Sequence, residues 1–348
     1  MNKASVSCEG IRLPAEWEDQ SFIQFTFPHR NSDWAYMYDS IVSCFVEIIQ
    51  QVAQFEPVLV VCYSRNEVSG LFVSATLFPI YFVEIDSNDT WARDHGAISV
   101  LKDGNAVLYD FAFNGWGQKF ESSLDNLITM NLSEKGLFSN ELVSLNFVLE
   151  GGSIESDGIG TLLTTSECLL SPHRNPQLNK DQITEFLKEL FGLEKVLWLD
   201  HGYLRGDDTD SHIDTLARIC SPTTIAYVKC DSQTDEHYAA LQMMEKQLKS
   251  FTNANNEKYK LVALPFPDPC FDAYGERLPA TYANFLFVNG GVLVPFYNVP
   301  QDQEAQKIFE DLFPDRIVKG VNCRPLIEQH GSLHCITMQY NRKVLLNP

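Results

Sequence analysis

Residues 329–338 of the chain read Gln-His-Gly-Ser-Leu-His-Cys-Ile-Thr-Met. A glycine-containing turn leads here into residues that favour β structure, and Cys335 falls where the turn becomes a strand. Loops on rigid scaffolds often carry catalytic residues, and a thiolate is a strong nucleophile. Most cysteines are nevertheless small buried hydrophobes, so Cys335 becomes a candidate nucleophile only through motifs found elsewhere in the chain.

Upstream of this stretch, short apolar runs alternate with segments of helical periodicity. Apolar spacing predicts helices over residues 39–55, 183–191, 235–251 and 305–313, and Gly192 is expected to end the second. Strands are predicted at residues 58–63, 80–85, 97–101, 106–109, 161–164, 196–199, 212–220, 224–228, 261–264, 284–288, 292–295, 317–321 and 334–338. No linker interrupts this alternation and no clean repeat is visible, so the sequence predicts one α/β domain spanning residues 1–348.

Composition narrows the class of protein. The formal net charge is −20, and 45% of the residues are hydrophobic. Nucleic acid needs a basic surface and is disfavoured, whereas a cationic substrate would be attracted. No apolar run can span a bilayer, and the amino terminus lacks a hydrophobic signal core. Nine cysteines without a C-x-x-C pair argue against a disulfide framework. We expect a cytoplasmic protein with reduced thiols, and a homo-oligomer is compatible with the sequence.

The densest group of polar residues lies in residues 207–214, where four carboxylates accompany one histidine. If this segment is a strand, His212 and Asp214 point to the same face, because side chains alternate with a period of two. An imidazole beside a carboxylate can serve as a general acid/base next to a substrate anchor, or as two metal ligands. A solvated acidic turn that includes Asp208 is the structural alternative.

A second motif places a carboxylate at the end of an apolar strand. Glu150 is followed directly by Gly151 and Gly152. Glycines at such a position let a ligand or another backbone approach closely. Glu150 can therefore orient a histidine as the third member of a catalytic set, or it is a surface residue of a strand-turn.

Two tryptophans complete the candidate residues. Trp91 and Asp94 are three residues apart and would share a face if the segment forms a turn. An aromatic face beside a carboxylate suits a cation, and Asp94 can hold a guanidinium through paired hydrogen bonds. Arg93 offers an alternative, an internal ion pair with Asp89 or Asp94. Trp116, between two glycines, either lines a pocket or anchors the core at a tight turn.

Taken together, these motifs resemble those of the agmatine deiminase family, a branch of the guanidine-modifying superfamily that includes bacterial peptidylarginine deiminases. The matching blocks cover almost the whole chain, and they are residues 13–18, 27–30, 88–96, 150–157, 165–176, 206–214 and 330–335. The blocks Glu-Gly-Gly-Ser-Ile-Glu and Gly-Asp-Asp-Thr-Asp-Ser-His-Ile-Asp are specific. His330 and Ser332 depart from the pattern Gly-Gly-Gly-Asn-Ile-His-Cys that many members have.

The resemblance implies a pentein-type α/β propeller, in which five ββαβ-like modules surround a pseudo-fivefold axis and a central active site. Catalytic roles are implied for Cys335 as nucleophile, His212 as general acid/base, Glu150 as the carboxylate that supports the histidine, and Asp94 and Asp214 as the groups that grip a guanidinium. Trp91 is implied as a pocket residue. Asp208 and Trp116 complete our set of expected substrate contacts.

The implied reaction is hydrolysis of agmatine to N-carbamoylputrescine and ammonia through an S-alkylthiouronium on Cys335, without metal or organic cofactor. Two carboxylates would hold the guanidinium carbon above the sulfur, and the cation would in turn favour the thiolate. Peptidylarginine deimination is the alternative within the same chemistry. A metal-dependent hydrolase built on His212 and the aspartates, and a non-catalytic cation-binding protein, are alternatives outside it.

Overall fold

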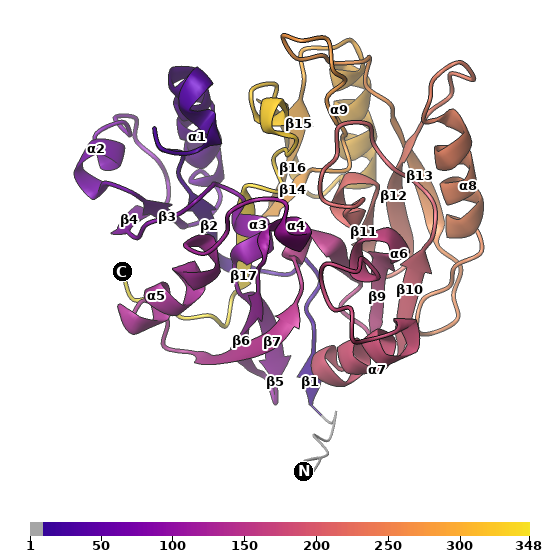
Figure 1. Cartoon of the computed structure of the whole chain (residues 1–348), viewed down its shortest axis with the longest axis horizontal. Coiled ribbons are helices and arrows are strands. Elements are labelled where there is room, and N and C mark those ends of the chain that lie inside the picture. The colour runs from indigo at the N-terminus through magenta and orange to yellow at the C-terminus, as the bar shows by residue number, and fades with distance from the viewer. Residues whose placement is uncertain (1–9) are drawn as a thin grey trace.

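The computed structural model describes residues 10–348, and these residues form five β-sheets. Figure 1 shows the sheets arranged around a common centre, with the longer helices at the perimeter. Each sheet contains an antiparallel strand pair and a third strand parallel to one member of that pair. Because a helix connects the two parallel strands, the repeating unit is β–β–α–β.

Four of these modules are continuous in sequence. The first contains β5 (Ile98–Lys102), β6 (Asn105–Ala112), α4 (Gly115–Gln118), α5 (Ile128–Glu134) and β7 (Glu141–Val148). The second contains β8 (Ile154–Ser156), β9 (Thr161–Thr165), α6 (Ser166–Leu169), α7 (Lys180–Phe191) and β10 (Lys195–Leu199). The third contains β11 (Ala217–Ser221), β12 (Thr224–Lys229), α8 (Tyr238–Leu248) and β13 (Lys260–Pro265). The fourth contains β14 (Leu286–Val288), β15 (Gly291–Phe296), α9 (Gln301–Leu312) and β16 (Ile317–Asn322).

The fifth module joins the two ends of the chain. It contains β2 (Gln20–Thr26), α1 (Tyr38–Val52), β3 (Val58–Cys62), α2 (Arg65–Ser69), β4 (Ile80–Glu84) and the carboxyl-terminal strand β17 (Thr337–Asn341). Strand β17 pairs antiparallel with β2, while β2, β3 and β4 are parallel. The short strand β1 (Ile11–Arg12) pairs with β5 of the neighbouring module. The ring is thus closed, and the fold is the expected pentein propeller.

The perimeter helices follow the predicted apolar periodicity. In α1 the side chains of Ile41, Phe45 and Ile48 are fully buried against the sheets. Helix α7 begins with a reciprocal capping box between Asn179 and Gln182, and it ends at Gly192, as predicted. Gly192 adopts the left-handed conformation, with φ 66°, which glycine permits without a Cβ clash. None of the described helices has the length and hydropathy needed to cross a bilayer.

The prediction of a strand over residues 212–220 is wrong at its beginning. Ile213–Thr215 is a 3-10 helix, and β11 starts only at Ala217. Two side-chain hydrogen bonds stabilise this turn. Thr209 Oγ1 accepts from the backbone nitrogen of His212, and Thr215 Oγ1 donates to the backbone carbonyl of His212. Such local bonds compete with a strand ladder. His212 and Asp214 therefore face the same site from a turn and not from a strand.

A turn of this kind precedes the first strand of every module, and these turns meet at the centre of the ring. The turn before β5 is the short helix α3 (Ala92–His95), which carries Asp94. The corresponding turns before β8, β11, β14 and β17 contain Gly152, Asp214, Asn284 and Cys335. The pseudo-fivefold repeat thus delivers one segment per module to a single place, although no repeat is visible in the sequence.

Candidate active site

A pocket at Cys335 is lined by acidic and aromatic side chains. Its walls include Trp91, Trp116 and five aspartates, namely Asp33, Asp89, Asp94, Asp207 and Asp208. No lysine or arginine is among the described residues that line it. A pocket with this lining favours a cation, because carboxylates and aromatic faces both present negative potential.

Cys335 is buried at the base of this pocket and contacts two polar residues. Its Sγ lies 3.3 Å from Nδ2 of Asn284 and 3.8 Å from Oδ2 of Asp214. Burial, together with the negative charges of Asp214 and Asp94, raises the pKa of the Cys335 thiol well above its usual value. The sulfur is therefore a thiol until a positive charge enters the pocket.

Asp94 is held by two donors that aim its carboxylate into the pocket. Trp116 Nε1 donates to Oδ2 at 3.0 Å, and the backbone nitrogen of Gly152 donates to Oδ1 at 3.0 Å. Of the two alternatives predicted for Trp116, a pocket residue or a core anchor, the structure shows that it lines the pocket. Its backbone is in the left-handed conformation, with φ 56°. Burial is the main reason that the pKa of Asp94 is raised to about 6.

Gly152 marks the point where three predicted residues converge. A Cβ atom at this position would lie 2.7 Å from His212 Nδ1, 3.0 Å from Asp94 Oδ1 and 3.1 Å from Asp214 Oδ2. Only glycine leaves room for this approach of three side chains from the turns of two other modules. The structure therefore brings Asp94, His212 and Asp214 together within reach of Cys335.

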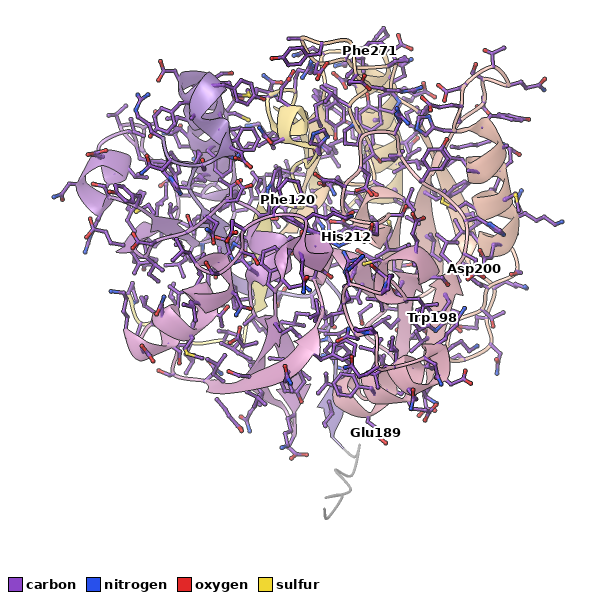
Figure 2. The ribbon with its side chains drawn as sticks, in the orientation of Figure 1. Phe120, Glu189, Trp198, Asp200, His212 and Phe271 are labelled. Atoms are coloured by element: carbon purple, nitrogen blue, oxygen red, sulfur yellow. The ribbon has the colours of Figure 1, made fainter. Side chains whose placement is uncertain are left out.

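The imidazole of His212 is almost fully buried near the middle of the molecule (Figure 2). Neither ring nitrogen has a hydrogen-bond partner among the described residues, and Nδ1 lies 3.7 Å from Asp94 Oδ1. Burial alone would lower the pKa of His212, but neighbouring negative groups, Asp94 foremost, hold it well above its usual value. These negative neighbours favour the protonated ring, which can act as a proton donor.

Glu150 is fully buried, so the alternative of a surface glutamate is wrong. Both of its oxygens accept from Nε of Arg174, at 2.9 and 3.0 Å, and Arg174 also binds Asp210 and the carbonyl of Thr209. Among the described residues no hydrogen bond joins Glu150 to His212, but the two lie in one cluster. Its support of the histidine is therefore electrostatic, since its negative charge raises the pKa of His212.

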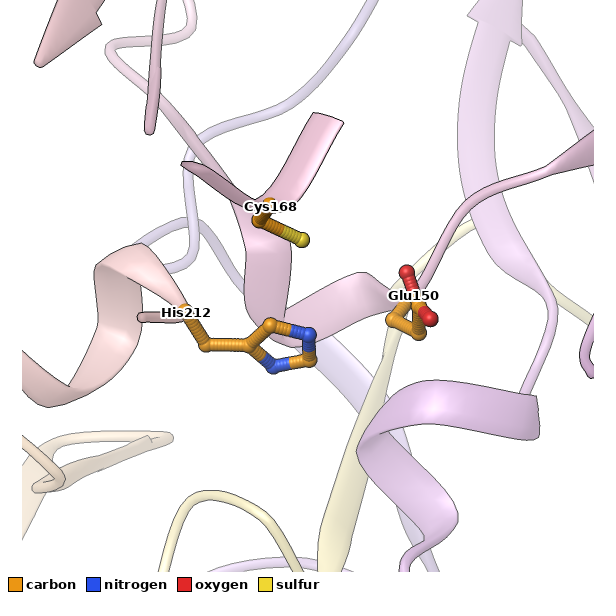
Figure 3. Close-up of side chains that lie close together, drawn as sticks. All are labelled: Glu150, Cys168 and His212. Atoms are coloured by element: carbon orange, nitrogen blue, oxygen red, sulfur yellow. The ribbon is translucent and has the colours of Figure 1, made fainter. Parts of the chain in front are cut away.

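Cys168 is the third member of that cluster. Donor atoms of Glu150, Cys168 and His212 lie within 4.8 Å of one another, and Figure 3 shows the sulfur, the ring and the carboxylate converging. The donor types suit zinc, but Arg174 places a cation against both carboxylate oxygens of Glu150. A divalent cation would have to displace this ion pair, so the arrangement fits a metal centre poorly. The eight described cysteines are free and buried, and Cys8 lies outside the described residues.

The remaining predicted residues line the pocket. Trp91 Nε1 donates to Asp89 Oδ2 at 2.9 Å, which fixes the indole ring. Arg93 pairs with Glu16 at 3.1 Å, so the predicted ion pair with Asp89 or Asp94 is wrong. The carboxyl group of Asp208 is largely desolvated, and burial together with Asp207 raises its pKa to about 6.

The two departures from the family pattern are accommodated locally. His330 takes the left-handed conformation, with φ 67°, that a glycine would adopt at this position. Ser332 is buried, and its Oγ lies 2.8 Å from the hydroxyl of Tyr297. The loop before Cys335 therefore keeps a defined shape with His330 in place of a glycine and Ser332 in place of an asparagine.

Asn284 and Arg174 are the site residues that the motifs did not single out. Asn284 occupies, in the fourth module, the position that Cys335 occupies in the fifth: two residues before the first strand. The sequence signal that could have indicated Asn284 is a polar residue just before a short apolar strand. Arg174 lies within the block at residues 165–176, and its pairing with Glu150 depends on contacts distant in sequence.

Comparisons with known proteins agree with this geometry. The model of the Porphyromonas-type peptidyl-arginine deiminase family matches residues 12–340. An agmatine deiminase from Pseudomonas aeruginosa is 33% identical, and the match covers 95% of both chains. The structure of a C. jejuni agmatine deiminase variant with substrate bound superimposes with a TM-score of 0.90 at 39% identity, over 95% of this chain and 96% of the other. A Porphyromonas gingivalis structure, provisionally described as an arginine deiminase, gives 0.90 at 49% identity over 96% and 99%.

Fold and site together define a pentein of the guanidine-modifying class, with a buried thiol, an imidazole and acidic residues at the centre of the ring. Within that class, the chain belongs to the Porphyromonas-type peptidyl-arginine deiminase family, whose model spans nearly all of it.

Proposed function

We propose that this protein is an agmatine deiminase that hydrolyses agmatine to N-carbamoylputrescine and ammonia. The observation that carries the proposal is the pocket itself, in which the sulfur of Cys335 lies at the base of a set of aspartates with no lysine or arginine in the lining. The curated relative from Pseudomonas aeruginosa, and the C. jejuni structure with substrate bound, support the same substrate.

The first half of the reaction begins when the guanidinium binds between Asp94 and Asp214. Oδ1 of Asp214 is buried and has no partner among the described residues, so it is free to accept a guanidinium N–H. The substrate's positive charge offsets the two carboxylates that keep Cys335 protonated, so the thiol releases its proton to solvent water and the thiolate forms. Sulfur then bonds to the guanidinium carbon, and the C=N electron pair moves onto nitrogen.

His212 serves both halves of the reaction. It gives its proton to the departing nitrogen, the C–N bond breaks, ammonia leaves, and an S-alkylthiouronium remains on Cys335. The neutral imidazole then takes a proton from water as the water oxygen bonds to the same carbon. Collapse of that adduct breaks the C–S bond, the remaining hydroxyl proton passes to the sulfur, and the ureido product leaves with the Cys335 thiol restored. No step requires a metal ion or an organic cofactor.

Charge at the far end of the substrate favours agmatine over other guanidino compounds. Agmatine carries a distal ammonium, and Asp207 and Asp208 are the pocket carboxylates that we assign to it. Free arginine has the same ammonium but adds a carboxylate beside it, which the acidic lining would repel. A peptidyl-arginine has neutral backbone at that position and gains nothing from these aspartates.

Cys335, and not Cys168, is the nucleophile in this proposal. Only Cys335 lies in the pocket lining and contacts Asp214, whereas Cys168 lies behind His212 in the Glu150 cluster. Residues 1–348 are proposed to act as one catalytic domain, because every module supplies a segment to the site. The free thiols of the described cysteines fit a cytoplasmic location.

A substrate panel with two cysteine variants tests the proposal. Purified protein is incubated with agmatine, free arginine and a blocked arginyl peptide, and ureido groups are quantified. We expect turnover of agmatine, a loss of at least about 10⁴-fold in Cys335→Ala, and retained turnover in Cys168→Ala. Activity on the peptide alone would replace agmatine by peptidyl-arginine as the substrate. Full activity in Cys335→Ala would remove the assigned nucleophile.

A further inference from the structure

His334, the residue immediately before Cys335, connects the site to a buried charge network. Its side chain is fully buried, and Nδ1 lies 2.8 Å from Oδ2 of Asp214. On the other side of the ring, Nε2 lies 2.9 and 3.0 Å from the carboxylate oxygens of Glu16 and 3.1 Å from Nη2 of Arg218. The imidazole therefore fills the space between Asp214 and the side chains of Glu16 and Arg218.

The charges beyond His334 compensate one another. Arg218 is fully buried and binds Glu16 and Glu155 through its guanidinium, and Arg93 lies 3.1 Å from Glu16. Two cations thus face two carboxylates. Glu16 belongs to the block at residues 13–18, to which the proposed reaction gives no role. The network fixes that amino-terminal block against the strand-turn that carries the nucleophile.

The geometry places a proton on Nδ1 of His334. An ionised Asp214 only accepts hydrogen bonds, so Nδ1 must carry a proton and donate it. Nε2 faces both an acceptor, the carboxylate of Glu16, and a donor, Nη2 of Arg218. Burial, with the charges of Arg218 and Arg93, lowers the pKa of His334, whereas Glu16 and the hydrogen bond to Asp214 raise it. The Nδ1–H donor is present whether or not Nε2 also carries a proton.

Asp214 needs this donor because its other surroundings disfavour a charge. It is fully buried, Cys335 lies 3.8 Å away, and Asp94 approaches the same point at Gly152. Burial would raise the pKa of Asp214, but the hydrogen bond and charge of His334, with the charges of His212 and Arg218, lower it. A protonated Asp214 would no longer attract the guanidinium or accept two hydrogen bonds from it.

We propose that His334 is a positioning residue, whose Nδ1–H holds the Asp214 carboxylate ionised and aimed at the guanidinium that binds next to Cys335. The proposal rests on the proposed function, because it assigns Asp214 to the substrate cation. Glu16 and Arg218 hold the far side of the ring, so that its donor points to Asp214.

Two polar substitutions separate positioning from simple packing. Asparagine carries its amide nitrogen on Cγ, as histidine carries Nδ1, whereas glutamine carries it one atom further out, near the place of Nε2. His334→Asn therefore keeps a donor for Asp214, and His334→Gln does not. For both variants kcat and KM for agmatine are measured from pH 5 to 9, with thermal unfolding as a check on folding.

We expect His334→Asn to keep the acid limb of kcat/KM where the parent has it. In His334→Gln the pKa of Asp214 should rise towards that of Asp94, so that two carboxylates must ionise, the acid limb steepens, and kcat/KM at pH 5 falls about tenfold while the values converge at high pH. Equal losses in the two variants at every pH, without steepening of the limb, would overturn the proposal.

A measurement on the unchanged protein tests the same proposal without relying on the folding of a variant or on agmatine turnover. With histidine labelled by ¹⁵N, we expect NMR to show a proton on Nδ1 of His334 throughout the range from pH 5 to 9. A neutral ring with its proton on Nε2 anywhere in that range would overturn the proposal even if agmatine is hydrolysed. Absence of agmatine turnover with Nδ1 protonated would instead overturn the proposed function alone.

Discussion

The amide nitrogen of Asn284 lies 3.3 Å from Sγ of Cys335, while Oδ1 of Asn284 accepts from the backbone nitrogen of His334 at 2.9 Å. The backbone donor decides which end of the amide faces the sulfur, so the end nearest the thiol is an N–H donor. A donor there stabilises the thiolate more than the thiol, and it lowers the pKa of Cys335 against the effect of burial.

Replacement of Asn284 by aspartate keeps the shape of the side chain and removes the donor. We expect Asn284→Asp to lower kcat at least about 100-fold and to slow alkylation of Cys335 by iodoacetamide at pH 8.5, because a carboxylate next to the sulfur opposes the thiolate. Peptide mapping by mass spectrometry reports the alkylation of Cys335 alone. Asn253→Asp is the matched control: Asn253 is equally buried but lies outside the pocket, so its replacement should leave alkylation unchanged.

The close approach at Gly152 gives a second prediction. In Gly152→Ala the new methyl group would meet His212 Nδ1, Asp94 Oδ1 and Asp214 Oδ2, each at 3.1 Å or less. We expect kcat/KM for agmatine to fall at least about 100-fold, because a displacement of about 1 Å at reacting groups has effects of this size. Gly70→Ala is the control, since a Cβ at Gly70 meets its nearest neighbour at an ordinary 3.4 Å. Equal kinetics in the two variants would show that the three side chains are not held at this point.

The elements that could be predicted from the sequence are those specified by local periodicity. The helix predicted at residues 39–55 is found as α1, Tyr38–Val52, and the strand predicted at 58–63 as β3, Val58–Cys62. Both are decided by which residues nearby in sequence are apolar. The chemical types at the site could also be predicted, because cysteine, histidine and carboxylates in specific blocks resemble a known family.

The parts that could not be predicted depend on pairings distant in sequence. Strands β8 and β14 have only three residues each, which hides the fivefold repeat. Arg93 pairs with Glu16, not with its near neighbours, and Arg174 reaches Glu150 from another segment. A strand prediction over His212 fails because two threonine hydroxyls bond its backbone. In each case a long-range or side-chain contact overrides the local pattern.

The ion pair between Arg174 and Glu150 leads to a prediction on metals. Because Arg174 occupies both carboxylate oxygens, the Glu150, Cys168 and His212 cluster should not need an ion for turnover. We expect unchanged kcat and KM after dialysis against EDTA and assay in excess chelator, and no metal at stoichiometric level by elemental analysis. Loss of activity that returns on addition of zinc would instead favour the metal-dependent hydrolase.

The pH dependence of kcat/KM should report the ionisation of Asp94. The carboxylate must be ionised to grip a guanidinium, and its pKa is raised to about 6, so kcat/KM should rise as the pH increases through about 6. Trp116→Phe removes the hydrogen bond to Oδ2, which stabilises the ionised form, and should move this limb to higher pH. Asp110→Asn is the control, because Asp110 also has a pKa of about 6 but contacts Ser144 outside the pocket. If the limb moves in Asp110→Asn, or stays fixed in Trp116→Phe, the group that limits activity in acid is not Asp94.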